Sequence, residues 1–141
     1  DLYVELAHAL AGQSQPDEAV RVLETAIVKI GNVSSLVLKT AQIEAGSGKL
    51  DVALARLKAM QKTAPRPEPW MAERARLLVR SGRIVEARQS WSELRDRIEA
   101  LPDHERGSHA MSALLDEART ALAVQDATVE IQTAALAAPA R

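Results

Sequence analysis

The chain has 141 residues, a length that suits one domain with a core of its own, and no uninterrupted apolar stretch long enough to span a membrane. Its 18 basic and 19 acidic residues give a net charge of −1, which argues against a protein held mainly by the phosphates of nucleic acid. The absence of cysteine excludes disulfides and thiol catalysis, and an aromatic content of 2% argues against a base-stacking surface.

The first hundred residues predict six helices arranged as three pairs. Alanine contributes 26 of the 141 residues and favours helices over strands. Glycines such as Gly12, Gly46 and Gly82 suit the ends of helices, while Pro67 and Pro69 suit the beginning of one. The first helices of the pairs are predicted at 1–12, 34–46 and 68–81, and the second helices at 16–30, 50–63 and 84–100.

A turn at 101–107 separates these pairs from a further helix, predicted from Ser108 as N-cap to about Gln125. Its apolar residues form one stripe, which suits a helix that covers the open face of the last pair. Val129 and Ile131 could belong to a short strand, or Thr133–Ala138 could extend a helix, and we expect residues 126–141 to form a mostly poorly ordered tail. The chain opens on Asp1 inside an apolar-periodic segment, so we also expect a piece of a longer protein.

Small and large side chains recur at one fixed interval along the chain. Three alanines at the start of the second helices, Ala19, Ala53 and Ala87, define this interval, because their two separations are equal. The same spacing relates the small and the apolar residues at further positions, which are Ala7/Ala41/Ala75, Tyr3/Val37/Met71, Leu23/Leu57/Trp91 and Ala26/Met60/Leu94. A fixed period of this length is typical of stacked helical hairpins, in which small residues let two helices cross closely.

These columns resemble the tetratricopeptide repeat family over about residues 1–100. The unit of that family has the same length as the interval from Ala19 to Ala53, with an apolar fourth position, small eighth and twentieth positions and a large twenty-fourth position. The chain departs from it at Thr40 and Arg74, where the family has leucine, and at Glu44, where a large residue is usual. The resemblance implies a right-handed α–α superhelix of three units, at about 1–33, 34–67 and 68–100. With the cap helix 108–125, it makes one domain of 1–125.

The resemblance also implies a concave surface that binds a peptide or helix of a partner protein. Its ligand-facing positions are filled by Val4, His8, Leu38, Gln42, Ala72, Arg76 and Arg80. Family members that hold the carboxylate ends of chaperone tails have lysine and asparagine at two of these positions, and this chain does not. We expect the acidic part of a partner to lie near Arg76 and Arg80, since arginine binds carboxylates through two hydrogen bonds. Self-association is compatible with the same pattern.

No catalytic, cofactor or metal site is predicted. The segment Gly46–Lys49 lacks the earlier glycine and the following Ser or Thr of a phosphate-binding loop. Asp103, His104, Glu105 and His109 suit a surface turn better than a metal site. The sequence therefore predicts a non-catalytic protein–protein interaction scaffold. One alternative is an accessory module of a larger enzyme; a helical-repeat RNA binder is disfavoured by the net charge.

Overall fold

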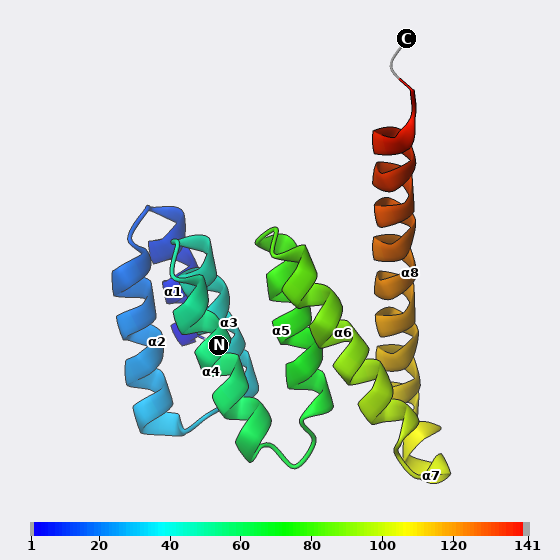
Figure 1. Cartoon of the computed structure of the whole chain (residues 1–141). Coiled ribbons are helices and arrows are strands. Elements are labelled where there is room, and N and C mark those ends of the chain that lie inside the picture. Colours follow the sequence, from blue (N-terminus) through cyan, green and yellow to red (C-terminus); the bar gives the residue numbers. More distant parts are fainter. Residues whose placement is uncertain (1, 140–141) are drawn as a thin grey trace. The chain divides into compact units, whose positions relative to one another are not determined.

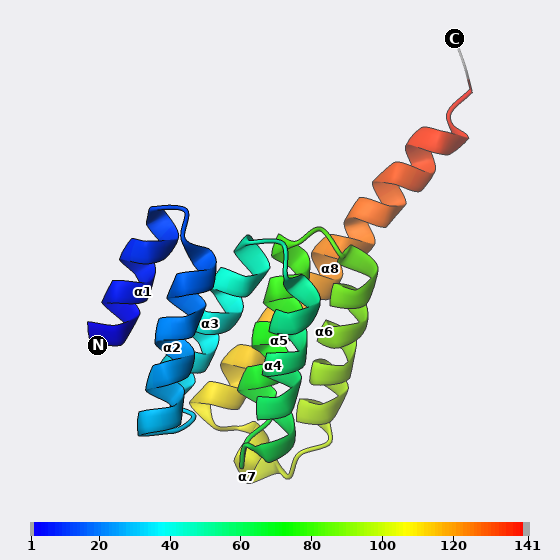
Figure 2. The same cartoon turned by 90° about the vertical axis from the view of Figure 1, so that its left-hand side faces the viewer.

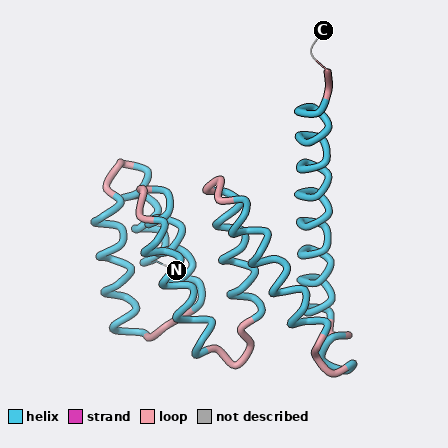
Figure 3. Tube along the Cα trace, viewed as in Figure 1, coloured by secondary structure: helices cyan, strands magenta, loops and turns pink. Residues whose placement is uncertain are grey.

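The computed structural model describes residues 2–139, which form eight helices and no strand (Figures 1 and 3). The helices are α1 (Leu2–Gly12), α2 (Pro16–Ile30), α3 (Ser34–Gly46), α4 (Leu50–Thr63), α5 (Glu68–Arg80), α6 (Ile84–Glu99), α7 (Asp103–Arg106) and α8 (His109–Ala137). The predicted all-α class is confirmed. The six helices of the predicted pairs agree with α1–α6 to within one residue at each end.

The three turns within the helix pairs have the same backbone hydrogen bonds, which recur with the period of the sequence. The amides of Gln15, Lys49 and Arg83 donate to the carbonyls of Leu10, Glu44 and Leu78, over 2.9, 2.8 and 3.0 Å. One residue before each of these amides, the backbone has a positive φ, of 60° at Ser14, 84° at Gly48 and 75° at Gly82. This is the left-handed turn that ends many helices, so the period of the sequence is also a period of local structure.

The chain divides into two compact units, residues 1–65 and 66–141, where the sequence suggested one domain of 1–125. Unit 1 contains α1 to α4 and unit 2 contains α5 to α8. No helix within residues 2–139 combines the length and the apolar character needed to cross a bilayer.

Unit 1 consists of the pairs α1–α2 and α3–α4, and α3 packs on α2 and also contacts α1. The small residues Ala7 and Ala19 are fully buried where α1 meets α2, as are Ala41 and Ala53 where α3 meets α4. A larger side chain at these positions would separate the helices. The core formed by α1, α2 and α3 contains Ala7, Ala19, Leu23, Ala26, Leu36 and Ile43.

Unit 2 repeats this arrangement with α8 as the third helix. The pair α5–α6 is followed by the short helix α7 within the predicted turn, and α8 then packs along α6 and contacts α5. Ser108 is the N-cap of α8, as predicted, and its hydroxyl accepts a hydrogen bond from the amide of Met111 over 3.3 Å. The core residues are Met71, Ala72, Ala75, Trp91, Leu94, Ile98, Met111, Leu115, Ala118 and Leu122.

Helix α8 is longer than the sequence analysis predicted, because it continues past Gln125 to Ala137. No glycine or proline interrupts the segment from His109 to Ala138, and Pro139 is the first residue that cannot continue a helix. The sequence analysis expects a mostly poorly ordered tail from residue 126, whereas the structure has a helix there up to Ala137; residues 140 and 141 lie outside the described part. Every residue from Asp126 to Pro139 is exposed, and this part of α8 extends past α6 (Figures 1 and 2).

Candidate binding groove

An open depression of about 640 Å³ lies between α1 and α3 in unit 1. It is lined by His8, Ala11, Ser14, Pro16, Lys39, Gln42, Ile43, Gly46 and Ser47. The lining combines small and apolar surface with hydroxyl, amide and imidazole groups, a mixture typical of sites that bind ligands. Among the described residues that line the depression, Lys39 supplies an ammonium group and none is an aspartate or a glutamate. We refer to this depression as the α1–α3 groove.

Two polar side chains of the groove contact each other across the two helices. The ammonium group of Lys39 lies 3.1 Å from Nδ1 of His8, so the lysine donates to the imidazole nitrogen. Lys39 is half-buried, and none of the described carboxylates pairs with it. Lys49, which follows α3, differs in this respect: its ammonium lies 2.8 Å from Asp17, and that ion pair lowers the pKa of Asp17 and raises the pKa of Lys49.

The structure brings together two of the four predicted site residues of unit 1. His8 and Gln42 both line the α1–α3 groove. Val4 instead packs against the core of unit 1, and Leu38 is half-buried outside the groove lining. The sequence analysis missed Lys39, although a helical wheel would have found it, because positions 39, 42, 43 and 46 share one face of a helix.

The predicted site residues of unit 2 do not form an open site, because α8 covers two of them. Ala72 is fully buried in the core that α5 forms with α6 and α8. Arg76 donates from Nε to Oε1 of Glu117 on α8 over 2.7 Å and from Nη2 to Oε2 over 2.6 Å. This pairing raises the pKa of Arg76 and lowers that of Glu117. Arg80 is exposed. The structure thus places Ala72 in the core and gives Arg76 an internal carboxylate partner.

A second group of charges in unit 1 is structural. Glu44 is only 2% exposed, and Arg56 on α4 donates from Nε to its Oε1 over 2.7 Å, while Oε2 has no hydrogen-bond partner. Arg56 also donates to Glu24 on α2 over 3.0 Å. The guanidinium therefore links three helices, and it neutralises the buried acid at a position where the family usually has a large residue.

The turn at 101–107 contributes a carboxylate to an ion pair. Glu105 lies 2.8 Å from the guanidinium of Arg66, which lowers the pKa of the carboxylate. Within residues 2–139, no group of three or more histidine, aspartate or glutamate side chains is arranged to hold a metal ion.

Comparison of the chain with protein-family models, with curated proteins and with solved structures finds no match.

Proposed function

We propose that this chain is a helical-repeat scaffold of the tetratricopeptide type, and that it binds a segment of a partner protein in the α1–α3 groove. The observation that carries the proposal is the groove itself, an open depression lined by His8 and Gln42. Both residues occupy positions that face ligands in the family that the sequence resembles.

The recurrence of local structure supports the repeat part of the proposal. Three turns share one set of hydrogen bonds at the interval of the sequence repeat, and α8 contacts α6 and α5 as α3 contacts α2 and α1. In repeat proteins each unit packs on the next one in the same way, and the resulting surface binds partners. The proposal therefore includes α8 as the helix that covers the last pair of a right-handed superhelix.

The lining of the groove supports binding of a polypeptide segment. Ala11, Ile43 and Gly46 provide apolar and backbone surface, and Gln42 provides an amide that can both donate to and accept from a peptide backbone. Polar groups that fix the orientation of a ligand above an apolar floor are a common feature of binding sites.

The test uses a display library of random peptides, each fused at both ends to a carrier protein so that no free terminus is presented. Peptides are selected from this library for binding to the whole chain. We expect selected peptides to bind the chain in solution and to lose at least tenfold in affinity when Gln42→Trp fills the groove. Gln89→Trp, at an exposed position of α6, is the matched control and should leave affinity unchanged. Failure to enrich any peptide over a blank surface, or equal binding to the Gln42→Trp variant, would refute the proposal.

A further inference from the structure

Resting on the proposed function, we propose that the α1–α3 groove selects a partner segment by an internal aspartate or glutamate, whose carboxylate docks on Lys39. The sequence analysis placed the acidic part of a partner near Arg76 and Arg80. The structure points instead to unit 1, because no carboxylate of the described residues pairs with Lys39, whereas Arg76 has two such partners within unit 2.

The pairing of the neighbouring cations is the first argument. Other half-buried or interhelical cations of unit 1 have an acid within contact distance: Lys49 has Asp17 at 2.8 Å, and Arg56 has Glu44 at 2.6 Å and Glu24 at 3.0 Å. Lys39 is half-buried; among residues 2–139 its ammonium lies within hydrogen-bond distance of a histidine nitrogen and forms no ion pair with a carboxylate. A partly desolvated ammonium without a counter-ion is unfavourable, so a carboxylate that enters the groove gains from neutralising it.

The geometry of the pair is the second argument. An ammonium group has three N–H donors, and the contact with His8 at 3.1 Å uses one of them. That contact restrains Lys39 beside the groove and leaves two donors for a ligand. The hydroxyl of Ser14 and the amide of Gln42 line the same depression and can donate further hydrogen bonds to a carboxylate.

Charge complementarity specifies the partner. The described lining residues include the ammonium group of Lys39 and no aspartate or glutamate, so an acidic side chain is attracted to Lys39 and meets no like charge among them. His8, Gln42, Gly46 and Ser47 are exposed, so the depression opens to solvent along both helices. An extended segment can therefore enter and leave, which favours an acidic residue within the segment over a terminal carboxylate.

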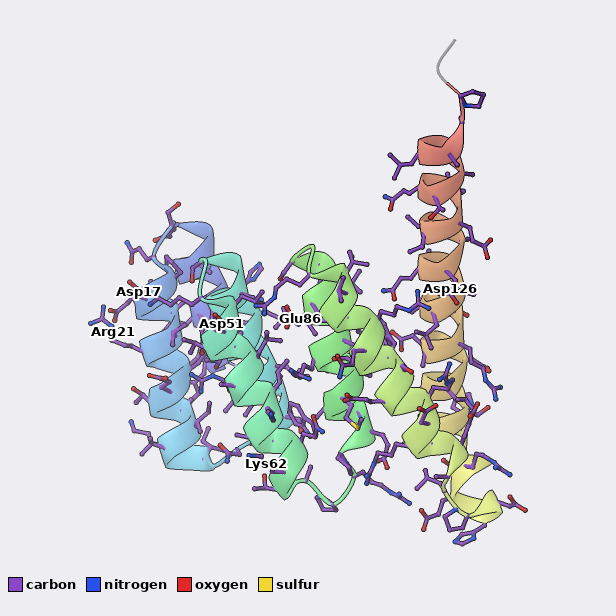
Figure 4. All side chains as sticks on the ribbon, in the orientation of Figure 1. Asp17, Arg21, Asp51, Lys62, Glu86 and Asp126 are labelled. Atoms are coloured by element: carbon purple, nitrogen blue, oxygen red, sulfur yellow. The ribbon has the colours of Figure 1, made fainter. Side chains whose placement is uncertain are left out.

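The experiment compares the sequences that the peptide library yields on the unchanged chain, on Lys39→Met and on Lys39→Glu. We expect one position of the peptides selected by the unchanged chain to be enriched in Asp and Glu. Lys39→Met should remove that enrichment and weaken acidic peptides at least tenfold, and Lys39→Glu should enrich Lys and Arg at the same position. Lys62→Met is the matched control, because Lys62 is exposed near the C-terminal end of α4 (Figure 4).

The possible outcomes separate this inference from the proposed function. Peptides that lose affinity for Gln42→Trp but show no acidic preference, or keep that preference in Lys39→Met, would overturn the inference and leave the scaffold function standing. The second arm of the experiment uses a peptide library with free carboxyl ends. If binding peptides are enriched from this library and not from the one fused at both ends, the groove takes a terminal carboxylate, and the inference is overturned. Selection of no peptide at all would refute both.

Discussion

Arg76 of α5 and Glu117 of α8 form a pair with two hydrogen bonds, of 2.7 and 2.6 Å, on the surface of unit 2. Nη1 of the same guanidinium donates to Glu73 over 2.5 Å, so one arginine meets two acids. Such a two-point contact fixes the rotation of one helix against another as well as their separation. The pair thus holds α8 beside α5. It also engages Arg76, which the sequence analysis expected to bind an acidic part of a partner protein.

Replacing Glu117 with Gln should make unit 2 less sensitive to acid. Arg76 lowers the folded-state pKa of Glu117 below the ordinary 4.5, so the pair stabilises the fold above pH 4.5 and this contribution is lost as the pH falls through the lowered pKa. Since both side chains are about one third exposed, at 34% and 38%, we expect about 1 kcal/mol or less at pH 7.

Urea unfolding of the unchanged chain and of Glu117→Gln between pH 7 and pH 3 measures this effect. The difference between the two proteins should shrink toward zero at the acid end. The control is Glu130→Gln, at an exposed position of α8, which should behave as the unchanged chain does. A difference that stays constant with pH would show that the charge of Glu117 does not contribute.

Ser14→Gly should stabilise unit 1 by about 0.5–1 kcal/mol, because Ser14 has a φ of 60°, where the equivalent positions of the other two turns have glycine. The measurement is the free energy of unfolding in urea. Ser81→Gly is the control, because Ser81 has a φ of −90° and gains nothing from glycine. This variant should be slightly destabilised, since glycine makes the unfolded chain more flexible. Destabilisation by Ser14→Gly would mean that the serine side chain contributes more than the backbone strain costs.

Arg56→Met should destabilise unit 1 by about 3 kcal/mol, because it leaves the carboxylate of Glu44 buried without a counter-charge. Glu24→Gln removes the exposed partner of the same arginine, whose side chain is 51% exposed, and should cost less than about 0.5 kcal/mol. Thermal and urea unfolding measure the free energy of unfolding of both variants, and the two losses are compared. Similar losses for the two variants would contradict the assignment of Glu44 as the acid that requires Arg56.

The exposed part of α8 should exchange its amide hydrogens much faster than the part that packs on α6. The core contacts of α8 end at Leu122, and Asp126, which forms an ion pair with Arg88 of α6, lies where the exposed part begins (Figure 4). Hydrogen exchange followed by NMR should show protection at 111–122 and little at 128–137. Deleting the residues after Asp126 should change the free energy of unfolding by less than about 0.5 kcal/mol, and a loss above about 1 kcal/mol would reveal a packing role for this segment.

The repeat period was enough to predict the six paired helices and their turns, because these depend on contacts between residues close in sequence. Small residues such as Ala7 and Ala19 mark where the two helices of a hairpin cross, and both are buried there. The length of α8 was also readable in principle, because Pro139 is the first helix-breaking residue after Gly107. It was underestimated because the apolar stripe weakens after Leu122, and an exposed helix needs no stripe.

By itself, the sequence determined that the chain is helical, where each hairpin begins and ends, and which small residues lie between paired helices. Only the tertiary structure decided which charged side chains are available to a ligand. Whether Arg76 or Lys39 is available to bind a ligand depends on whether a carboxylate from another helix lies within about 3 Å of the cation. For Arg76 that carboxylate belongs to Glu117, which is 41 residues away in the chain. A spacing pattern along one helix carries no information about such a distance, because the packing of helices remote in sequence sets it.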